Sequence, residues 1–172
     1  SAGALDQVAT AAAAVTDHEL RLTGLTPATR YYYAIGSAAG DLAGDASYTF
    51  VTPPVAGTAR KSRLWVLGDS GDPLGSVPVR NGYVAYNGSL DCDLWLMLGD
   101  NAYSSGTDAE FQSAVFNVFP TLLRRSPLWP TRGNHEVEQA GGFNPYYDIF
   151  TMPRAGEVGG DASGTEAWYS FD

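Results

Sequence analysis

Three short polar segments of this chain carry side chains that can bind metal ions or transfer protons. They are Gly68-Asp69-Ser70-Gly71, Gly99-Asp100-Asn101-Ala102-Tyr103 and Gly133-Asn134-His135-Glu136. Each segment directly follows a short run of mostly apolar residues, so each presents Asp or Asn at the end of a candidate strand. Carboxylate and amide oxygens are metal ligands, and imidazole is the side chain that changes charge near neutral pH.

A hydrolytic site with two metal ions needs one anionic ligand shared by both ions and separate ligands for each. Asp69 and Asp100 supply two carboxylates, and Asn134 offers a neutral oxygen without adding repulsion. His135 could donate a proton to a leaving group or bind a phosphate oxygen. A single Gly-Asp after a strand is usually a plain turn, but three such segments in succession indicate a site that hydrolyses phosphate esters.

The sequence predicts that strands alternating with helices position these three segments. Strands are expected at Leu64–Leu67, Leu94–Leu98 and Leu128–Arg132, and helices at Asn81–Leu90 and Asp108–Leu123. Thr107 or Asp108 can cap the second helix, and Pro120 is expected to break or kink it. This alternation predicts a layered βαβ domain in which ligands gather at the carboxyl ends of the strands.

The first fifty residues read differently, as an all-β module. Strands are expected around Ala11–Thr16, His18–Leu22, Tyr31–Ile35 and Tyr48–Thr52, with a hairpin loop at Gly36–Asp41. Tyr31 follows a Pro-bearing turn, so its hydroxyl can return to the backbone of that turn, as in a tyrosine corner. Pro53-Pro54 is a stiff connector, which divides the chain into domains at 1–54 and 60–172.

The amino-acid composition argues against some classes of function. The 172 residues carry 19 Asp and Glu against 10 Lys and Arg, a net charge of −9, which argues against nucleic acid or an anionic membrane as partner. No apolar run reaches transmembrane length. The single cysteine, Cys92, excludes an internal disulfide and is read as a packed thiol. Few lysines and many small residues favour a secreted or extracytoplasmic protein.

The three segments, written GDxG, GDxxY and GNHE, resemble the first three signature blocks of the calcineurin-like metallophosphoesterases. Tyr103 in the second block and the LxPxTxY segment at Leu25–Tyr31 make the purple acid phosphatases the nearest resemblance. The resemblance implies an incomplete α/β metallophosphoesterase domain of layered β-sheets with helices. It also implies a partial fibronectin type III-like sandwich before that domain, and acid phosphatase-like hydrolysis of a small phosphorylated substrate in one in-line step.

The resemblance also implies a role for each matching residue. Asp69 would bind the first metal, Asp100 would bridge both, and Tyr103 would bind the first metal, a ferric ion, as phenolate. Asn134 would bind the second metal, which is Zn, Mn or Fe in that family, and His135 would contact the phosphate and assist the leaving group. A ring packed at the sheet edge is the alternative for Tyr103. Glu136, Asp72 and Asn101 receive no role.

The chain departs from the family pattern because two further His-bearing blocks do not occur in it. The only other histidine, His18, belongs to the β module and is read as an ordinary strand position. The remaining donors are all oxygens, which favour Mg, Ca or Mn over Zn and Fe. We therefore expect the isolated chain to bind transition metals weakly, to turn over phosphate esters slowly or not at all, and to expose apolar edges, with the remainder of its own domain as a partner.

Two other functions stay open. One is a non-catalytic binding module that contains a degenerate phosphoesterase domain, and the other is a phosphodiesterase or nucleotidase of the same superfamily. A structural or adhesive role for the β module alone leaves the three strand-end segments unexplained.

Overall fold

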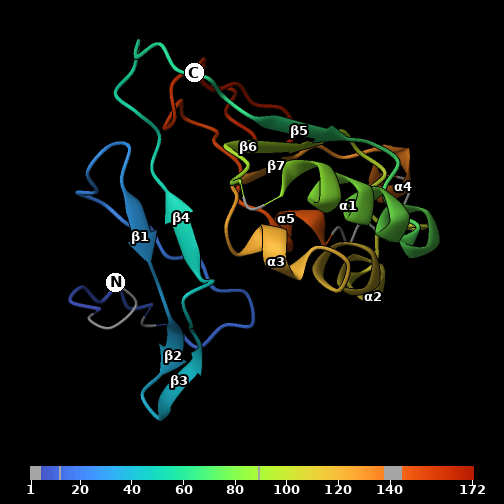
Figure 1. Ribbon diagram of the computed structural model, residues 1–172. Helices are drawn as coiled ribbons and strands as arrows, with labels where there is room; N and C mark the ends of the chain where they lie inside the picture. Colours follow the sequence, from blue (N-terminus) through green and yellow to red (C-terminus); the bar gives the residue numbers. More distant parts are fainter. Residues whose placement is uncertain (1–4, 12, 89, 138–144) are drawn as a thin grey trace.

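The computed structural model describes residues 5–11, 13–88, 90–137 and 145–172, which form two parts that lie side by side (Figure 1). The first part holds four short strands, β1 to β4, and the second holds a three-stranded sheet with helices. No helix within the described ranges is long and apolar enough to cross a membrane.

The sheet of the second part is parallel, in the order β5-β6-β7. Its strands are β5 (Leu64–Leu67), β6 (Leu94–Met97) and β7 (Leu128–Pro130), which agree with the three predicted strands to within two residues. Because all three strands run in the same direction, the polar segments that follow them meet at one edge of the sheet, beside α4 in Figure 1. The predicted alternation of strands and helices is confirmed in this part of the chain.

Helix α1 (Pro73–Asn87) begins eight residues before the predicted start at Asn81. Pro78 and the glycines inside this helix have low helix propensity, so the sequence did not predict its first two turns. The start is fixed by Asp72, whose side chain accepts a hydrogen bond from the Leu74 N–H, and by Pro73 in the first turn.

The helix predicted over Asp108–Leu123 is divided into three pieces. They are α2 (Asp108–Phe111), a π-helical turn η1 (Gln112–Phe116) and α3 (Pro120–Leu123). Thr107 caps α2 in a capping box with Glu110, which confirms one of the two predicted caps. The predicted break at Pro120 is also confirmed, because α3 begins there and proline has no N–H to continue the preceding ladder.

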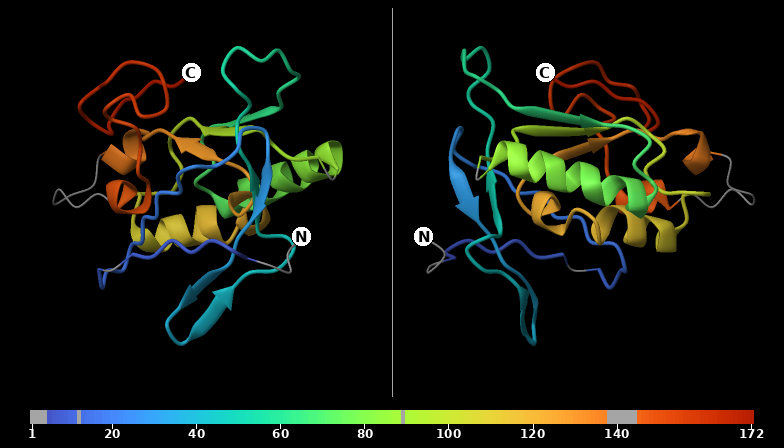
Figure 2. Two further views of the ribbon diagram at one scale, coloured as in Figure 1. Left: turned by 90° about the vertical axis from the view of Figure 1, so that its left-hand side faces the viewer. Right: turned by 45° about the vertical axis from the view of Figure 1, so that its right-hand side comes forward.

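The core lies between the sheet and the helices that cover one of its faces (Figures 1 and 2). Trp65 stacks on Tyr83 of α1 at 4.1 Å between ring centroids and on Trp95 at 5.2 Å. On the opposite face, Trp129 is covered by Phe171 at 4.4 Å. Leu64 and Val66 are about half exposed on that face, at 54% and 51%.

In the first part, β1 (Arg30–Tyr32) pairs with β4 (Thr49–Val51), and β2 (Ile35–Ser37) pairs with β3 (Gly40–Ala43), both antiparallel. The predicted hairpin is present, but its strands extend into the expected loop at 36–41. The Tyr31 hydroxyl accepts a hydrogen bond from the Thr26 N–H at 2.8 Å. The predicted return of this hydroxyl to the preceding turn is therefore confirmed.

The two strands predicted nearest the N-terminus are wrong. Among the described residues before Arg30 there is no strand, and Leu20 and Leu22 are 49% and 47% exposed. His18 is exposed in the same irregular stretch rather than in a strand. Period-two alternation predicts a strand only where a neighbouring strand can complete the hydrogen-bond ladder, and none of the described strands pairs with this stretch.

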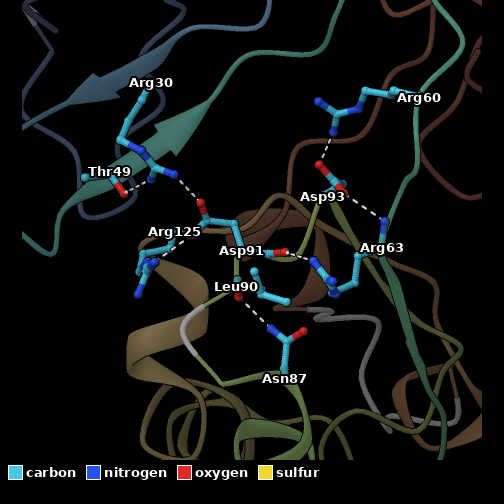
Figure 3. Close-up of polar contacts among 9 residues, drawn as sticks. All are labelled: Arg30, Thr49, Arg60, Arg63, Asn87, Leu90, Asp91, Asp93 and Arg125. Atoms are coloured by element: carbon cyan, nitrogen blue, oxygen red, sulfur yellow. Dashed lines mark hydrogen bonds and ion pairs between the residues drawn. The ribbon is translucent and has the colours of Figure 1, made fainter.

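Polar contacts fasten the two parts together. Arg30 of β1 and Arg125 both form ion pairs with Asp91, at the entrance of β6 (Figure 3). The Tyr33 hydroxyl donates to the Arg124 carbonyl oxygen at 2.9 Å, and the Arg124 guanidinium lies 5.0 Å from the Tyr48 ring centroid. Within the second part, Asp93 forms an ion pair with Arg60 and accepts a hydrogen bond from the Arg63 N–H at 2.7 Å, which fixes the segment before β5 against the start of β6.

Two short helices complete the structure, α4 (Asn134–Val137) and α5 (Tyr146–Ile149). The sequence also predicts that a glycine-rich loop at 141–164 borders the site. Residues 141–144 of this loop lie outside the described residues, and its described portion includes α5.

Candidate functional site

The three strand-end segments are in direct contact with one another. The Asp69 N–H donates to the Gly99 carbonyl oxygen at 3.1 Å, and the Gly71 N–H donates to that of Asp100 at 2.9 Å. The His135 N–H, from the third segment, donates to the Asp100 carboxylate at 3.1 Å. The parallel sheet therefore brings Asp69, Asp100 and the start of α4 to one place.

Both aspartates lie in a backbone conformation that is unusual for residues other than glycine. The φ angles of Asp69 and Asp100 are 51° and 52°. A left-handed conformation costs of order 1–3 kcal/mol, although Asp tolerates it better than most residues. Tight turns directly after the strands hold both carboxylates at the carboxyl edge of the sheet, and the hydrogen bonds between the segments hold the turns.

Tyr103 lies against both neighbouring segments. Its hydroxyl donates to the Asp69 carboxylate at 3.1 Å, and its ring meets the His135 ring edge-on, with centroids 4.7 Å apart. Burial, the hydrogen bond to Asp69 and the nearby carboxylates together raise the pKa of Tyr103 to about 12. Without a cation the side chain is therefore a neutral phenol at physiological pH.

The His135 ring is oriented by a backbone carbonyl. Its Nδ1 lies 2.6 Å from the Ser104 carbonyl oxygen, which can only accept, so Nδ1 carries the proton of this bond. In the neutral ring, Nε2 then has the lone pair. Ser104 is held in turn by Glu110, whose carboxylate accepts its N–H at 2.6 Å.

Asn134 is the first residue of α4 and is exposed at the same edge of the sheet. Its neighbours in the chain, Gly133 and His135, both contact Asp100. The backbone of Asn134 therefore lies beside Asp100, as the predicted site requires.

Close backbone packing explains two of the glycines. A Cβ on Gly71 would lie 2.6 Å from the Tyr103 nitrogen, and a Cβ on Gly133 would lie 2.0 Å from the Asp100 carboxylate. Any side chain at position 71 or 133 would therefore push the segments apart.

The sequence reading gave no role to Glu136, which the structure places beneath the site. Its carboxylate is buried, with the residue 1% exposed, and accepts hydrogen bonds from backbone N–H groups of the second and third segments. The sequence does contain one signal for this contact. Glu136 stands three residues after Gly133, which is the spacing at which the acidic residue of a capping box bonds to the first N–H of a helix. Asn101, also without a predicted role, is fully buried and donates to the Thr131 carbonyl oxygen at 2.8 Å.

The donor set fits part of an oxygen coordination sphere. Two ligands at right angles around a small hard cation are about 3 Å apart, given metal–oxygen distances near 2.1 Å. The Tyr103 and Asp69 oxygens, 3.1 Å apart, match that spacing. Throughout the described ranges, no group of three or more His, Cys, Asp or Glu side chains could hold a metal ion. The expected ligands include only two residues of these types, Asp69 and Asp100.

The site is open to solvent, because Asp69 and Asn134 are both exposed. Cavities of about 420 and 440 Å³ lie elsewhere, one beside Asp108 and Ile149 and the other between α1 and α3.

The chain is similar to purple acid phosphatase 15 of Arabidopsis thaliana. The two are 26% identical over 180 aligned positions, which cover 90% of this chain and 32% of the plant protein. The chain thus spans about a third of the length of the curated relative it matches. No family model matches the chain, and no solved structure matches it.

Proposed function

We propose that this chain carries part of a metal-dependent site that hydrolyses phosphate esters, as an acid phosphatase-like enzyme of the purple acid phosphatase family. The observation that carries the proposal is the convergence of Asp69, Asp100, Tyr103 and His135 at one edge of a parallel sheet. The similarity to a plant purple acid phosphatase over 90% of the chain supports it. The proposal includes a metallophosphoesterase domain at 60–172 and a partial fibronectin type III-like domain at 1–54.

In this proposal, Asp69 and Tyr103 would hold the first of two cations, Asp100 would be the ligand shared by both, and Asn134 would hold the second. When bound, these cations, Fe with Zn, Mn or Fe, would supply Lewis acidity at this end of the sheet. The His135 N–H fixes the Asp100 carboxylate through its hydrogen bond. Ser104 holds the His135 ring by Nδ1, so Nε2 is the atom that exchanges a proton with the leaving-group oxygen.

Ferric binding by Tyr103 is the sharpest test of the metal site. A phenol whose pKa is about 12 must lose its proton to become a phenolate ligand, so binding releases a proton and creates a visible charge-transfer band. We expect this band in the chain titrated with Fe³⁺ and its loss in Tyr103→Phe. Tyr86→Phe is the matched control, because Tyr86 is 92% exposed on α1. A band that persists in Tyr103→Phe would contradict the assignment.

Hydrolysis is tested with p-nitrophenyl phosphate in the presence of Mn²⁺, Zn²⁺ or Fe³⁺. Asp69→Asn and Asp100→Asn should each lower turnover by at least ~10²-fold, since each removes a charged ligand while asparagine tolerates the left-handed backbone. Asp161→Asn, at an exposed position, is the control. Equal turnover and equal Mn²⁺ affinity by calorimetry in all four proteins would refute the proposal.

The second candidate is a non-catalytic binding module, favoured by the oxygen-only donor set. It predicts that the chain binds inorganic phosphate only when Mn²⁺ is present, yet shows no turnover of the monoester or of bis-p-nitrophenyl phosphate. Turnover of the diester alone would instead favour a phosphodiesterase of the same superfamily.

A further inference from the structure

Glu136 joins the second and third strand-end segments through its two carboxylate oxygens. Oε1 accepts hydrogen bonds from the Asn101 N–H at 2.7 Å and the Ala102 N–H at 3.0 Å. Oε2 accepts from the Gly133 N–H at 2.7 Å and the Asp100 N–H at 3.1 Å. The second segment follows β6 and the third follows β7, so one buried side chain bridges the ends of two strands.

This arrangement bears directly on the spacing between the proposed reacting groups. Asp100 donates its own N–H to Glu136 and accepts the His135 N–H through its carboxylate. His135 precedes Glu136 in α4, and Gly133 lies against the Asp100 carboxylate. Asp100 therefore contacts both Gly133 and His135, and the Glu136 carboxylate accepts hydrogen bonds from the Asp100 and Gly133 N–H groups.

We propose that Glu136 is a positioning residue that sets the distance between Asp100 and His135 by binding the backbone N–H groups of both strand-end segments. It does not touch substrate or metal. The consequence for catalysis rests on the function proposed above, whereas the positioning itself is a property of the folded chain.

A carboxylate is required because each of its oxygens accepts two N–H donors. In Glu136→Gln, which has almost the same shape, the amide oxygen can serve only one of the two pairs. The amide NH₂ group then faces the other pair, donor against donor, and leaves two buried N–H groups without an acceptor.

The test is amide hydrogen exchange measured by NMR on the full chain, wild type and Glu136→Gln. We expect one pair, either Asn101 and Ala102 or Asp100 and Gly133, to exchange at least ~10-fold faster while the other pair keeps its protection. The Trp95 N–H, bonded to the Pro127 carbonyl oxygen within the sheet, reports global opening and should be unchanged. The matched control is Glu157→Gln, since the exposed Glu157 also accepts two backbone N–H groups.

Two outcomes would overturn the proposal. In the first, all four amides keep their wild-type exchange rates in Glu136→Gln. In the second, Trp95 and the four amides accelerate by the same factor, which would show a general loss of stability and no local positioning.

The effect of Glu136 on catalysis is measured separately, by steady-state turnover of p-nitrophenyl phosphate with Mn²⁺. Glu136→Gln should lower kcat by ~10-fold or more with KM within about twofold, because the reacting geometry is altered and the exposed binding surface is not. A KM increase at unchanged kcat would contradict positioning. If the wild type neither binds Mn²⁺ nor shows turnover, the proposed function fails, and the exchange experiment still decides the role of Glu136.

Discussion

Because Gly133 packs closely against Asp100, a single methyl group added at position 133 would perturb the site. In Gly133→Ala, the new Cβ would lie 2.0 Å from the Asp100 carboxylate oxygen and 2.3 Å from the Asp100 nitrogen. Real Cβ atoms essentially never approach other atoms within 3.0 Å, so the oxygen must move by about 1 Å and the nitrogen by about 0.7 Å. The nitrogen cannot move freely, because its N–H is bonded to Glu136.

The size of the effect follows from these displacements. Forcing a methyl group into closely packed backbone costs about 1–3 kcal/mol of unfolding free energy. A displacement of about 1 Å in a catalytic group lowers turnover by about 10²-fold. The variant should therefore lose both stability and Mn²⁺ affinity, with the larger proportional loss in turnover of p-nitrophenyl phosphate.

Urea unfolding, calorimetry with Mn²⁺ and steady-state turnover measure the three quantities. Gly82→Ala is the control of opposite sign, since Gly82 lies within α1 with nothing inside 4 Å of its would-be Cβ. That substitution should stabilise the protein by about 0.5–1 kcal/mol. If Gly133→Ala were as stable and as active as the wild type, the packing derived for the Asp100 carboxylate would be wrong.

Three further substitutions test a contact within the first part, the start of α2 and the contact between the two parts. Tyr31→Phe removes the acceptor of the Thr26 N–H and should lower the unfolding free energy by about 1 kcal/mol in urea; no change would show that solvent replaces this bond. Thr107→Ala removes the α2 cap and should cost about 1 kcal/mol, measured by thermal unfolding, whereas an unchanged Tm would deny the cap any energetic role. Burial raises the pKa of Asp91, but hydrogen bonds and charges from Arg30 and Arg125 outweigh it and lower the pKa overall. A lowered folded-state pKa stabilises the protein above the ordinary carboxylate value of about 4, and this stabilisation is lost as pH falls through the lowered value. Asp91→Asn should thus cost about 1 kcal/mol at pH 7 and progressively less as the pH falls below about 4, and a cost that does not decrease at low pH would contradict the ion-pair explanation.

The strands of the sheet could be predicted because their residues are apolar, β-prone and bounded by glycine or proline. Helix α1 shows the limit of that reasoning. Its first turns contain Pro78 and glycine, and only the Asp72 side chain and Pro73 reveal the true start. The strands expected near Leu20 failed for a related reason, since pairing partners cannot be read from a local pattern.

The convergence of Asp69 and Asp100 could be predicted because parallel strands end at a common edge. The position of Glu136 could be read only in part. Its spacing from Gly133 is a known helix-start pattern, but its bonds to Asn101 and Ala102 join residues more than 30 positions apart through backbone groups. Backbone N–H groups are the same in every residue type except proline, so such contacts leave no trace in the sequence.

The contacts that fasten β1 to the second part also constrain the order of events during protein synthesis. Tyr33 bonds to Arg124, 91 positions later, and Arg30 pairs with Asp91, 61 positions later. A ribosome adding about 5–20 residues per second needs about 5–20 s to make the later partner of Tyr33. Until these partners have been made, the nascent β1–β4 segment cannot form these contacts, so its two antiparallel strand pairs are exposed to proteases and chaperones.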